Sequence, residues 1–243
     1  MTKHELRAIR REERHTEERA RERSRTMNRV VTWFSVFAGI GLVVGGLVWL
    51  AKISGPKVPT GPVPGVNEVV ADDHVFGKAD STVTLIEYGD FQCPACGLYY
   101  PMVKQVKSEF GDRIRFVFRN FPLSQIHSNA VLGAHAAEAA GKQGKYWEMH
   151  DKLYENQKEW SEGTASAARS AIEGYAKDLG LNLDQFKNDI DSDAVASKVD
   201  TDYASGVKAG VNSTPTFYLN GTLFTASTYD DFKQSITKEL GTK

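Results

Sequence analysis

The chain contains two cysteines, Cys93 and Cys96, separated by two residues. A C-x-x-C spacing brings both sulfurs within bonding distance when the first cysteine caps a helix and the second lies one turn further on. The positive end of the helix dipole then favours a thiolate on Cys93, by roughly 0.3 to 2 kcal/mol. A lower pKa for Cys93 stabilises the dithiol, which makes the disulfide an oxidant and Cys93 a good leaving group. The pair therefore predicts a redox-active dithiol, with Cys96 as the less exposed, resolving thiol.

Two other uses of the cysteine pair stay open on the residues alone. The pair could supply half of a zinc site, but a structural zinc site needs four ligands, and the sequence has no second cysteine pair or close Cys/His cluster. An inert structural disulfide is the other use, although it would close very little chain. We therefore expect no metal and no cofactor besides the redox-active pair itself.

The elements that must position the pair are a strand before it and a helix that it starts. Residues 83–88 are β-branched and apolar between glycine and aspartate residues, which predicts a buried strand. Residues 94–110 predict a helix, with Pro94 at its first position, where a missing N–H costs nothing, and a kink at Pro101. The apolar residues that predict the helix recur every four positions: Leu98, Met102, Val106 and Phe110.

The rest of the globular region completes an α/β order. Residues 113–119 alternate polar and apolar side chains and predict a second strand, parallel to the first. A helical stretch at about 124–209 follows. Residues 216–224 predict a hairpin whose Asn220-Gly221 pair favours a type I′ turn, and a last helix covers 229–240. A βαβ unit, a helical insertion and a ββα unit make a thioredoxin fold interrupted by a helical domain.

The N-terminal third of the chain predicts a membrane anchor. Residues 30–51 contain no charged side chain, and 22 residues at about 1.5 Å each can cross a bilayer core of roughly 30 Å. Ten Lys/Arg residues precede this span within residues 1–29, so the positive-inside rule places the N-terminus in the cytoplasm and the remainder outside. Residues 52–69 are rich in proline and glycine and predict a semi-extended tether. We expect a single-pass signal-anchor rather than a cleaved signal peptide, which would have a shorter apolar run.

Several separated motifs together resemble the DsbA-like thiol-disulfide oxidoreductases. They are the strand with Asp-Phe-x-Cys-Pro-x-Cys, the helix with an internal proline, Asn-Phe-Pro-Leu at 120–123, His-Ser-Asn-Ala at 127–130, residues 143–150, and Ser-Thr-Pro-Thr-Phe at 213–217. The likeness covers about residues 70–241, and the membrane-anchored, Gram-positive-type members are the most similar.

The resemblance assigns roles to residues at and around the pair. It implies that Cys93 is the nucleophile that forms a mixed disulfide with substrate and that Cys96 closes the disulfide. Glu87 matches the family's buried acid, which would move a proton to or from Cys96; a solvent-facing carboxylate at the strand end is the alternative. Pro215 matches the cis-proline that faces the disulfide, and the backbone of Thr214 would pair with an extended substrate segment.

The dipeptide inside the motif, Pro94-Ala95, is expected to shape the active site. The family's strong oxidant has histidine where this chain has Ala95. Alanine supplies neither a charge nor a side-chain hydrogen bond, so we predict weaker thiolate stabilisation and a less extreme redox potential.

Taken together, these features predict a membrane-anchored dithiol oxidase that introduces disulfides into exported proteins. Its expected partners are exported proteins with free thiols and a quinone-linked membrane oxidoreductase that reoxidises the pair. The glutamates among the basic residues of 1–29 argue against nucleic-acid binding. A reductase or isomerase of the same fold, and a non-catalytic binding module displayed on the membrane, remain the alternatives.

Overall fold

The computed structural model describes residues 33, 39–46 and 61–241, and its contacts divide the chain into two units, Met1–Lys57 and Val58–Lys243. In the first unit, residues 39–46 are helical and exposed. Among the described residues, no helix combines the length and apolar composition that a membrane crossing requires. Most of the predicted span at 30–51, the segment 1–29 and the tether up to residue 60 lie outside the described residues and stay predictions.

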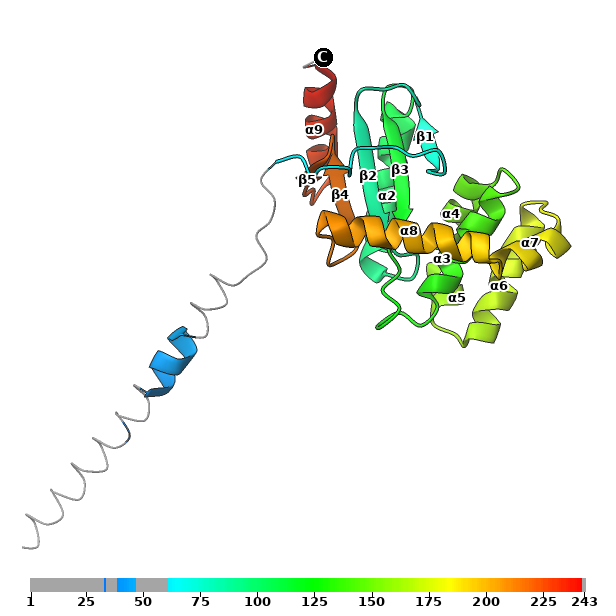
Figure 1. The fold of residues 1–243 in the computed structure, drawn as a ribbon, viewed down its shortest axis with the longest axis horizontal. Coiled ribbons are helices and arrows are strands. Elements are labelled where there is room, and N and C mark those ends of the chain that lie inside the picture. The colour runs from blue at the N-terminus through cyan, green and yellow to red at the C-terminus, as the bar shows by residue number, and fades with distance from the viewer. Residues whose placement is uncertain (1–32, 34–38, 47–60, 242–243) are drawn as a thin grey trace, which may run out of the picture. The chain divides into compact units, whose positions relative to one another are not determined.

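A five-stranded mixed sheet organises the second unit (Figure 1). The strand order is β1-β3-β2-β4-β5; β2 and β3 are parallel, and the other neighbours are antiparallel. The strands are β1 (Val75–Gly77), β2 (Thr84–Gly89), β3 (Arg115–Asn120), β4 (Thr216–Leu219) and β5 (Thr222–Phe224). The edge strand β1 is a feature that the sequence analysis missed.

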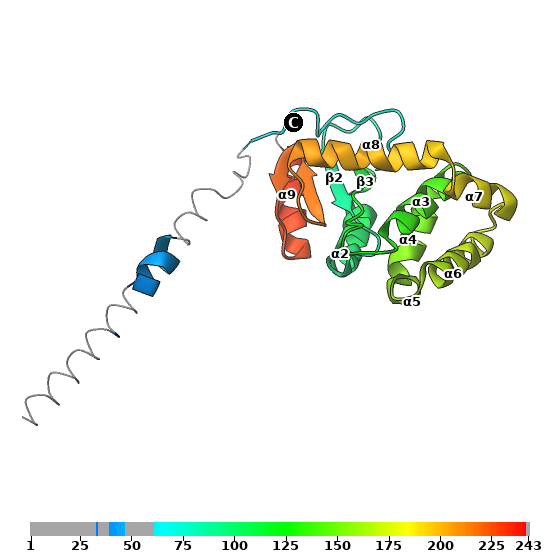
Figure 2. The same cartoon turned by 60° about the horizontal axis from the view of Figure 1, so that its bottom comes forward.

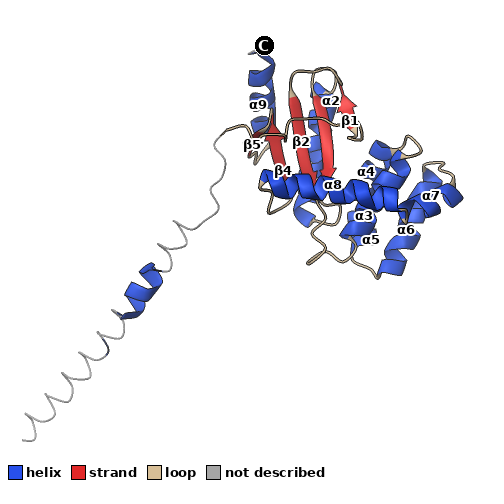
Figure 3. Cartoon of the chain, viewed as in Figure 1, coloured by secondary structure: helices blue, strands red, loops and turns tan. Residues whose placement is uncertain are grey.

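Helices cover both faces of this sheet and extend beyond it (Figure 2). Helices α2 and α9 pack on one face and α8 crosses the other, while α3 to α7 gather beside the sheet (Figure 3). Their bounds are α2 (Pro94–Phe110), α3 (Ala130–Gly141), α4 (Tyr146–Glu155), α5 (Gln157–Ser161), α6 (Ala165–Asp178), α7 (Leu183–Ile190), α8 (Asp193–Ala209) and α9 (Tyr229–Gly241). Helices α3 to α8 thus lie between β3 and β4 along the chain.

The central strand β2 is buried along its whole length. Because successive side chains of a strand point to opposite faces, Leu85 joins the apolar cluster formed with α2 and α9, whereas Ile86 and Tyr88 join the cluster formed with the end of α8. Burial of each such large apolar side chain contributes about 1.5 to 3 kcal/mol. The strand that precedes the cysteines is therefore held rigidly from both sides.

Most predicted elements are confirmed, with ends that agree to within two residues. The hairpin has positive φ at both turn residues, 49° at Asn220 and 79° at Gly221, as a type I′ turn requires. Helix α2 runs from residue 94 to 110 and includes Pro101.

The apolar stripe predicted for α2 is wrong at its first position, because Leu98 is 77% exposed. A repeat of four residues drifts around a helix of 3.6 residues per turn. The face that packs instead carries Cys96, Tyr100, Val103 and Lys107, at spacings of four, three and four. Lys107 therefore lies on the same face of α2 as Cys96.

Candidate active site

Cys93 is the residue that caps α2, with extended backbone angles (φ −65°, ψ 121°). Its carbonyl accepts the first helical hydrogen bond from the Gly97 N–H at 3.1 Å. Pro94 occupies the first helical turn, and Cys96 lies within it. Both cysteines are free thiols; Cys93 is 7% exposed and Cys96 is 1% exposed. The order of accessibility thus agrees with the predicted division between an attacking and a resolving thiol.

The surroundings of the two sulfurs separate their pKa values. The pKa of Cys93 is lowered to about 5, chiefly by a hydrogen bond from the Cys96 side chain and also by the backbone N–H groups of Cys96 and Ala95, against the opposing effect of burial. Burial raises the pKa of Cys96 well above its usual range, and the bond to Cys93 raises it again. At neutral pH the reduced pair therefore holds one thiolate, on Cys93, and one thiol, on Cys96.

Glu87 is buried on β2, at 3% exposure. It lies opposite Phe118 of β3 and Phe217 of β4, which belong to the apolar cluster that also contains both cysteines. Desolvation raises the pKa of Glu87 to about 8, with the positive charge of Lys107 opposing the shift. The solvent-facing alternative for Glu87 is therefore wrong, and the carboxyl group is mostly protonated at neutral pH.

Lys107, which the sequence analysis did not single out, is a buried cation on the same helix face as Cys96. Its Nζ lies 3.5 Å from Asp151 Oδ1, 4.6 Å from the centre of the Phe76 ring and 4.3 Å from that of Trp147. Burial lowers its pKa, while Asp151 and Glu87 oppose that change. The spacing of eleven residues from Cys96, three helical turns, is the sequence signal that could have revealed it.

The loop before β4 closes the site opposite α2. The Thr214–Pro215 peptide bond is cis, as the resemblance implied. In its protonated form the Cys93 thiol donates a hydrogen bond to the Thr214 carbonyl, with an Sγ to O distance of 3.4 Å. Residues that are 121 positions apart in the sequence therefore meet at the sulfur of Cys93.

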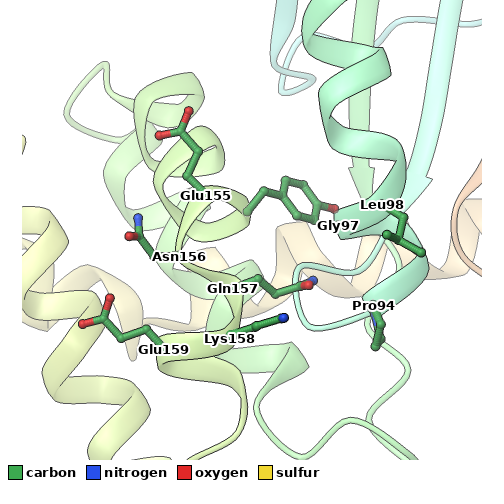
Figure 4. Close-up of a pocket in the computed structure, with 9 residues that line it drawn as sticks. Pro94, Gly97, Leu98, Glu155, Asn156, Gln157, Lys158 and Glu159 are labelled. Carbon is green, nitrogen blue, oxygen red and sulfur yellow. The ribbon is translucent and has the colours of Figure 1, made fainter.

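A groove of about 580 Å³ opens beside the start of α2 (Figure 4). Pro94, Gly97 and Leu98 form one side, and residues of α4 and α5 form the other. Figure 4 shows the side chain of Gln157 extending from α5 toward the start of α2. The groove places exposed apolar surface within a few residues of Cys93.

Among the residues that the structure describes, no three His, Cys, Asp or Glu side chains are placed to hold a metal ion. His127 instead binds the Asp90 carboxylate at 2.7 Å, and His150 binds Asp151 at 2.9 Å. Burial lowers the pKa of His150 to about 4, so this ring is neutral at pH 7.

Comparisons with known proteins agree with this geometry. The family model described as thioredoxin matches residues 70–238. Oxidised BdbD from Bacillus subtilis superposes with a TM-score of 0.65 and 26% sequence identity, covering 76% of this chain and all of that chain. Alpha-DsbA1 from Wolbachia pipientis gives a TM-score of 0.64 at 20% identity, over 72% of this chain and 94% of its own, which supports the fold.

The relatives found by sequence comparison are named as sodium/proton antiporters. The Na(+)/H(+) antiporter NhaA 1 of Salinispora arenicola is 39% identical over 166 residues, which are 65% of this chain and 24% of the antiporter. The chain thus spans about a quarter of the length of such relatives, too little to carry over their transport activity. The thioredoxin model matches more than half of the chain, and BdbD superposes on the same fold, which leads to one conclusion: the chain belongs to the thioredoxin family.

Proposed function

We propose that the chain is a membrane-anchored dithiol oxidase that works outside the cytoplasm. The observation that carries the proposal is the separation of the two cysteine pKa values, with Cys93 lowered to about 5 and Cys96 raised. A thiol that ionises easily is a good leaving group, and a stable Cys93 thiolate favours the dithiol over the disulfide. The disulfide form of such a pair tends to take electrons from other thiols.

The reaction proceeds by two thiol-disulfide exchanges. A substrate thiolate attacks Cys93 Sγ of the disulfide, so that a mixed disulfide forms and the sulfur of Cys96 leaves. A second substrate thiolate then attacks the substrate sulfur of the mixed disulfide, which forms the substrate disulfide and releases the Cys93 thiolate. Two electrons pass from the substrate to the cysteine pair, and the protons of the substrate thiols are shared between solvent and the site.

Glu87 serves the first exchange as a proton donor in this proposal. Cys96 must leave as a thiolate although its surroundings raise its pKa. A carboxyl group with a pKa of about 8 is mostly protonated at neutral pH and can supply the proton that neutralises the departing sulfur. The Thr214 carbonyl lies 3.4 Å from the sulfur of Cys93, and the Thr214 backbone would pair with the extended substrate segment.

Repeated turnover requires an oxidant that removes two electrons from the reduced pair. We propose a quinone-linked membrane oxidoreductase, and exported proteins with free thiols as substrates. The uncharged run at 30–51, the basic residues before it and the tether at 52–69 support a single-pass anchor with the redox domain outside. Protease treatment of intact cells should remove a C-terminal tag from the full chain; a protected tag would contradict this topology.

Trapping of mixed disulfides tests the direction of electron flow. The Cys96→Ala variant of the full chain cannot resolve a mixed disulfide internally, so that bound partners remain covalently attached to Cys93. We expect thiol-containing exported proteins and a quinone-linked membrane oxidoreductase, with none trapped by the Cys93→Ala/Cys96→Ala variant. Capture of a reducing partner powered from the cytoplasm would reverse the direction, and full function of the double variant would favour a non-catalytic binding module.

A further inference from the structure

The turn that presents Cys93, residues 90–93, is held by side chains from distant parts of the fold. The Asp90 carboxylate accepts hydrogen bonds from the backbone N–H groups of Gln92 at 2.8 Å and Leu123 at 2.9 Å. The Cys93 N–H donates to the Asp90 carbonyl at 3.1 Å and closes the turn. Gln92 in turn binds the Asn129 N–H at 2.6 Å. These contacts fix the start of the turn, but they do not reach the carbonyl group of Cys93.

Gln157, the first residue of α5, binds the carbonyl group of Cys93. Its Nε2 donates to the carbonyl of Phe91 at 2.8 Å and to the carbonyl of Cys93 at 2.9 Å. A side-chain amide has two N–H donors, so both are used on carbonyls that lie two residues apart. Sixty-four residues separate Gln157 from Cys93 in the sequence.

The two hydrogen bonds from Gln157 favour a negative charge on the sulfur of Cys93. The carbonyl oxygen of Cys93 carries a partial negative charge close to its own side chain, and the Gly97 N–H alone would leave one of its lone pairs unused. The amide of Gln157 brings the positive end of its dipole to that oxygen. In a partly buried site such a dipole is weakly screened, and it favours negative charge nearby.

We propose that Gln157 is a positioning residue for Cys93, which fixes the turn through its two carbonyls and stabilises the thiolate. This inference rests on the proposed role of Cys93 as the nucleophile. It adds a residue of the helical part of the fold to the determinants of reactivity at the start of α2.

The glycine at position 97 provides an independent observation. A Cβ built there would lie 2.4 Å from Oε1 and 3.0 Å from Cδ of Gln157. A side chain at this position would therefore push the amide away from the two carbonyls. Gly97 is in the second turn of a helix, where its conformational freedom brings no benefit, so the close approach of Gln157 explains the glycine.

The test compares four single variants, and the double variant Gln157→Met/Gly97→Ala, with the wild type, all as the reduced full chain. Gln157→Met removes the donors, Gln157→Glu replaces the amide by a carboxylate beside the same carbonyls, and Gly97→Ala displaces the amide without changing it. Gln185→Glu is the matched control, because Gln185 is exposed on α7 and binds Asp189. The Cys93 thiolate is titrated by its absorbance near 240 nm, and the equilibrium of the pair with glutathione is measured at pH 7.

We expect Gln157→Glu to raise the midpoint of Cys93 by about one pH unit and to weaken the oxidising strength about tenfold in the glutathione equilibrium. Gln157→Met and Gly97→Ala should shift both in the same direction by a smaller amount. Their effects should not add in the double variant, since they remove the same bonds. Gln185→Glu should leave the midpoint unchanged.

The outcomes separate the inference from the function on which it rests. An unchanged midpoint in Gln157→Glu and Gly97→Ala, with a wild-type midpoint below neutrality, would overturn the role of Gln157 alone. An equal shift in the Gln185→Glu control would do the same, because it would show a general effect of charge. A wild-type midpoint at the ordinary value for cysteine, about 8.5, would instead count against the proposed function.

Discussion

Replacement of Glu87 by glutamine should make the protein more stable and less active. The side chain is buried, and its pKa is raised from 4.5 to about 8. The folded chain therefore keeps a proton that the unfolded chain releases between these two values, so the carboxyl group lowers stability as the pH rises through this window. Glutamine keeps the shape of the protonated group and cannot ionise.

The pKa shift sets the expected size of the effect. At about 1.36 kcal/mol per unit, a carboxyl group with these two pKa values destabilises the fold by about 1 kcal/mol at pH 5, about 3 kcal/mol at pH 7 and about 5 kcal/mol at pH 9. The Glu87→Gln variant should therefore gain about 4 kcal/mol relative to the wild type between pH 5 and pH 9. The comparison within the reduced state cancels the titration of the two cysteines.

Urea unfolding at these three pH values measures the difference. Glu162→Gln, which removes an exposed carboxylate after α5, is the matched control and should show no such trend. A stability gain that is the same at pH 5 and pH 9 would refute a raised pKa at Glu87.

The same variant tests the proton donor. Formation of the mixed disulfide should slow on the order of 10²-fold at pH 7, the low end of what a positioned general acid provides. Loss of activity together with a gain in stability cannot arise from damage to the fold. Unchanged exchange kinetics would show that Cys96 leaves without help from Glu87.

Three further predictions concern neighbouring residues. The absorbance of the reduced chain near 240 nm should titrate with a midpoint near 5, and replacement of Cys93 by alanine should remove this transition; a midpoint above 8 would contradict the thiolate. Ala95→His should make the pair more oxidising in glutathione equilibrium, because it adds a positive charge or a donor beside the Cys93 sulfur; an Ala95→His variant with an unchanged equilibrium would sink this explanation. Lys107→Met should raise the pKa of Glu87 further, because it removes the positive charge that opposes the effect of burial. The pH profile of exchange should then move to higher pH. Lys104→Met, which changes an exposed lysine on α2, is the control and should leave the profile in place.

Local features of the sequence were enough to predict most of the fold. The alternation of side chains in the strands, Pro94 at a helix start and the Asn220-Gly221 turn each act through backbone preferences of adjacent residues. The short strand β1 was missed because three residues carry too little pattern, and its pairing with β3 is a tertiary contact. Leu98 was wrongly assigned to the packed face of α2, since a repeat of four does not reveal which side of a helix meets the sheet.

The cysteine spacing by itself predicts dithiol chemistry, because two sulfurs one helical turn apart are held by local backbone geometry, but it leaves a zinc site and a structural disulfide open. What only the tertiary structure decided is how strongly each group ionises. The pKa of Cys93 depends on the Cys96 side chain and on burial, and that of Glu87 depends on burial and on Lys107. The carbonyl of Cys93 accepts a hydrogen bond from Gln157, 64 residues away. Desolvation and long-range hydrogen bonds exist only after packing, so no local pattern of residues could have supplied them.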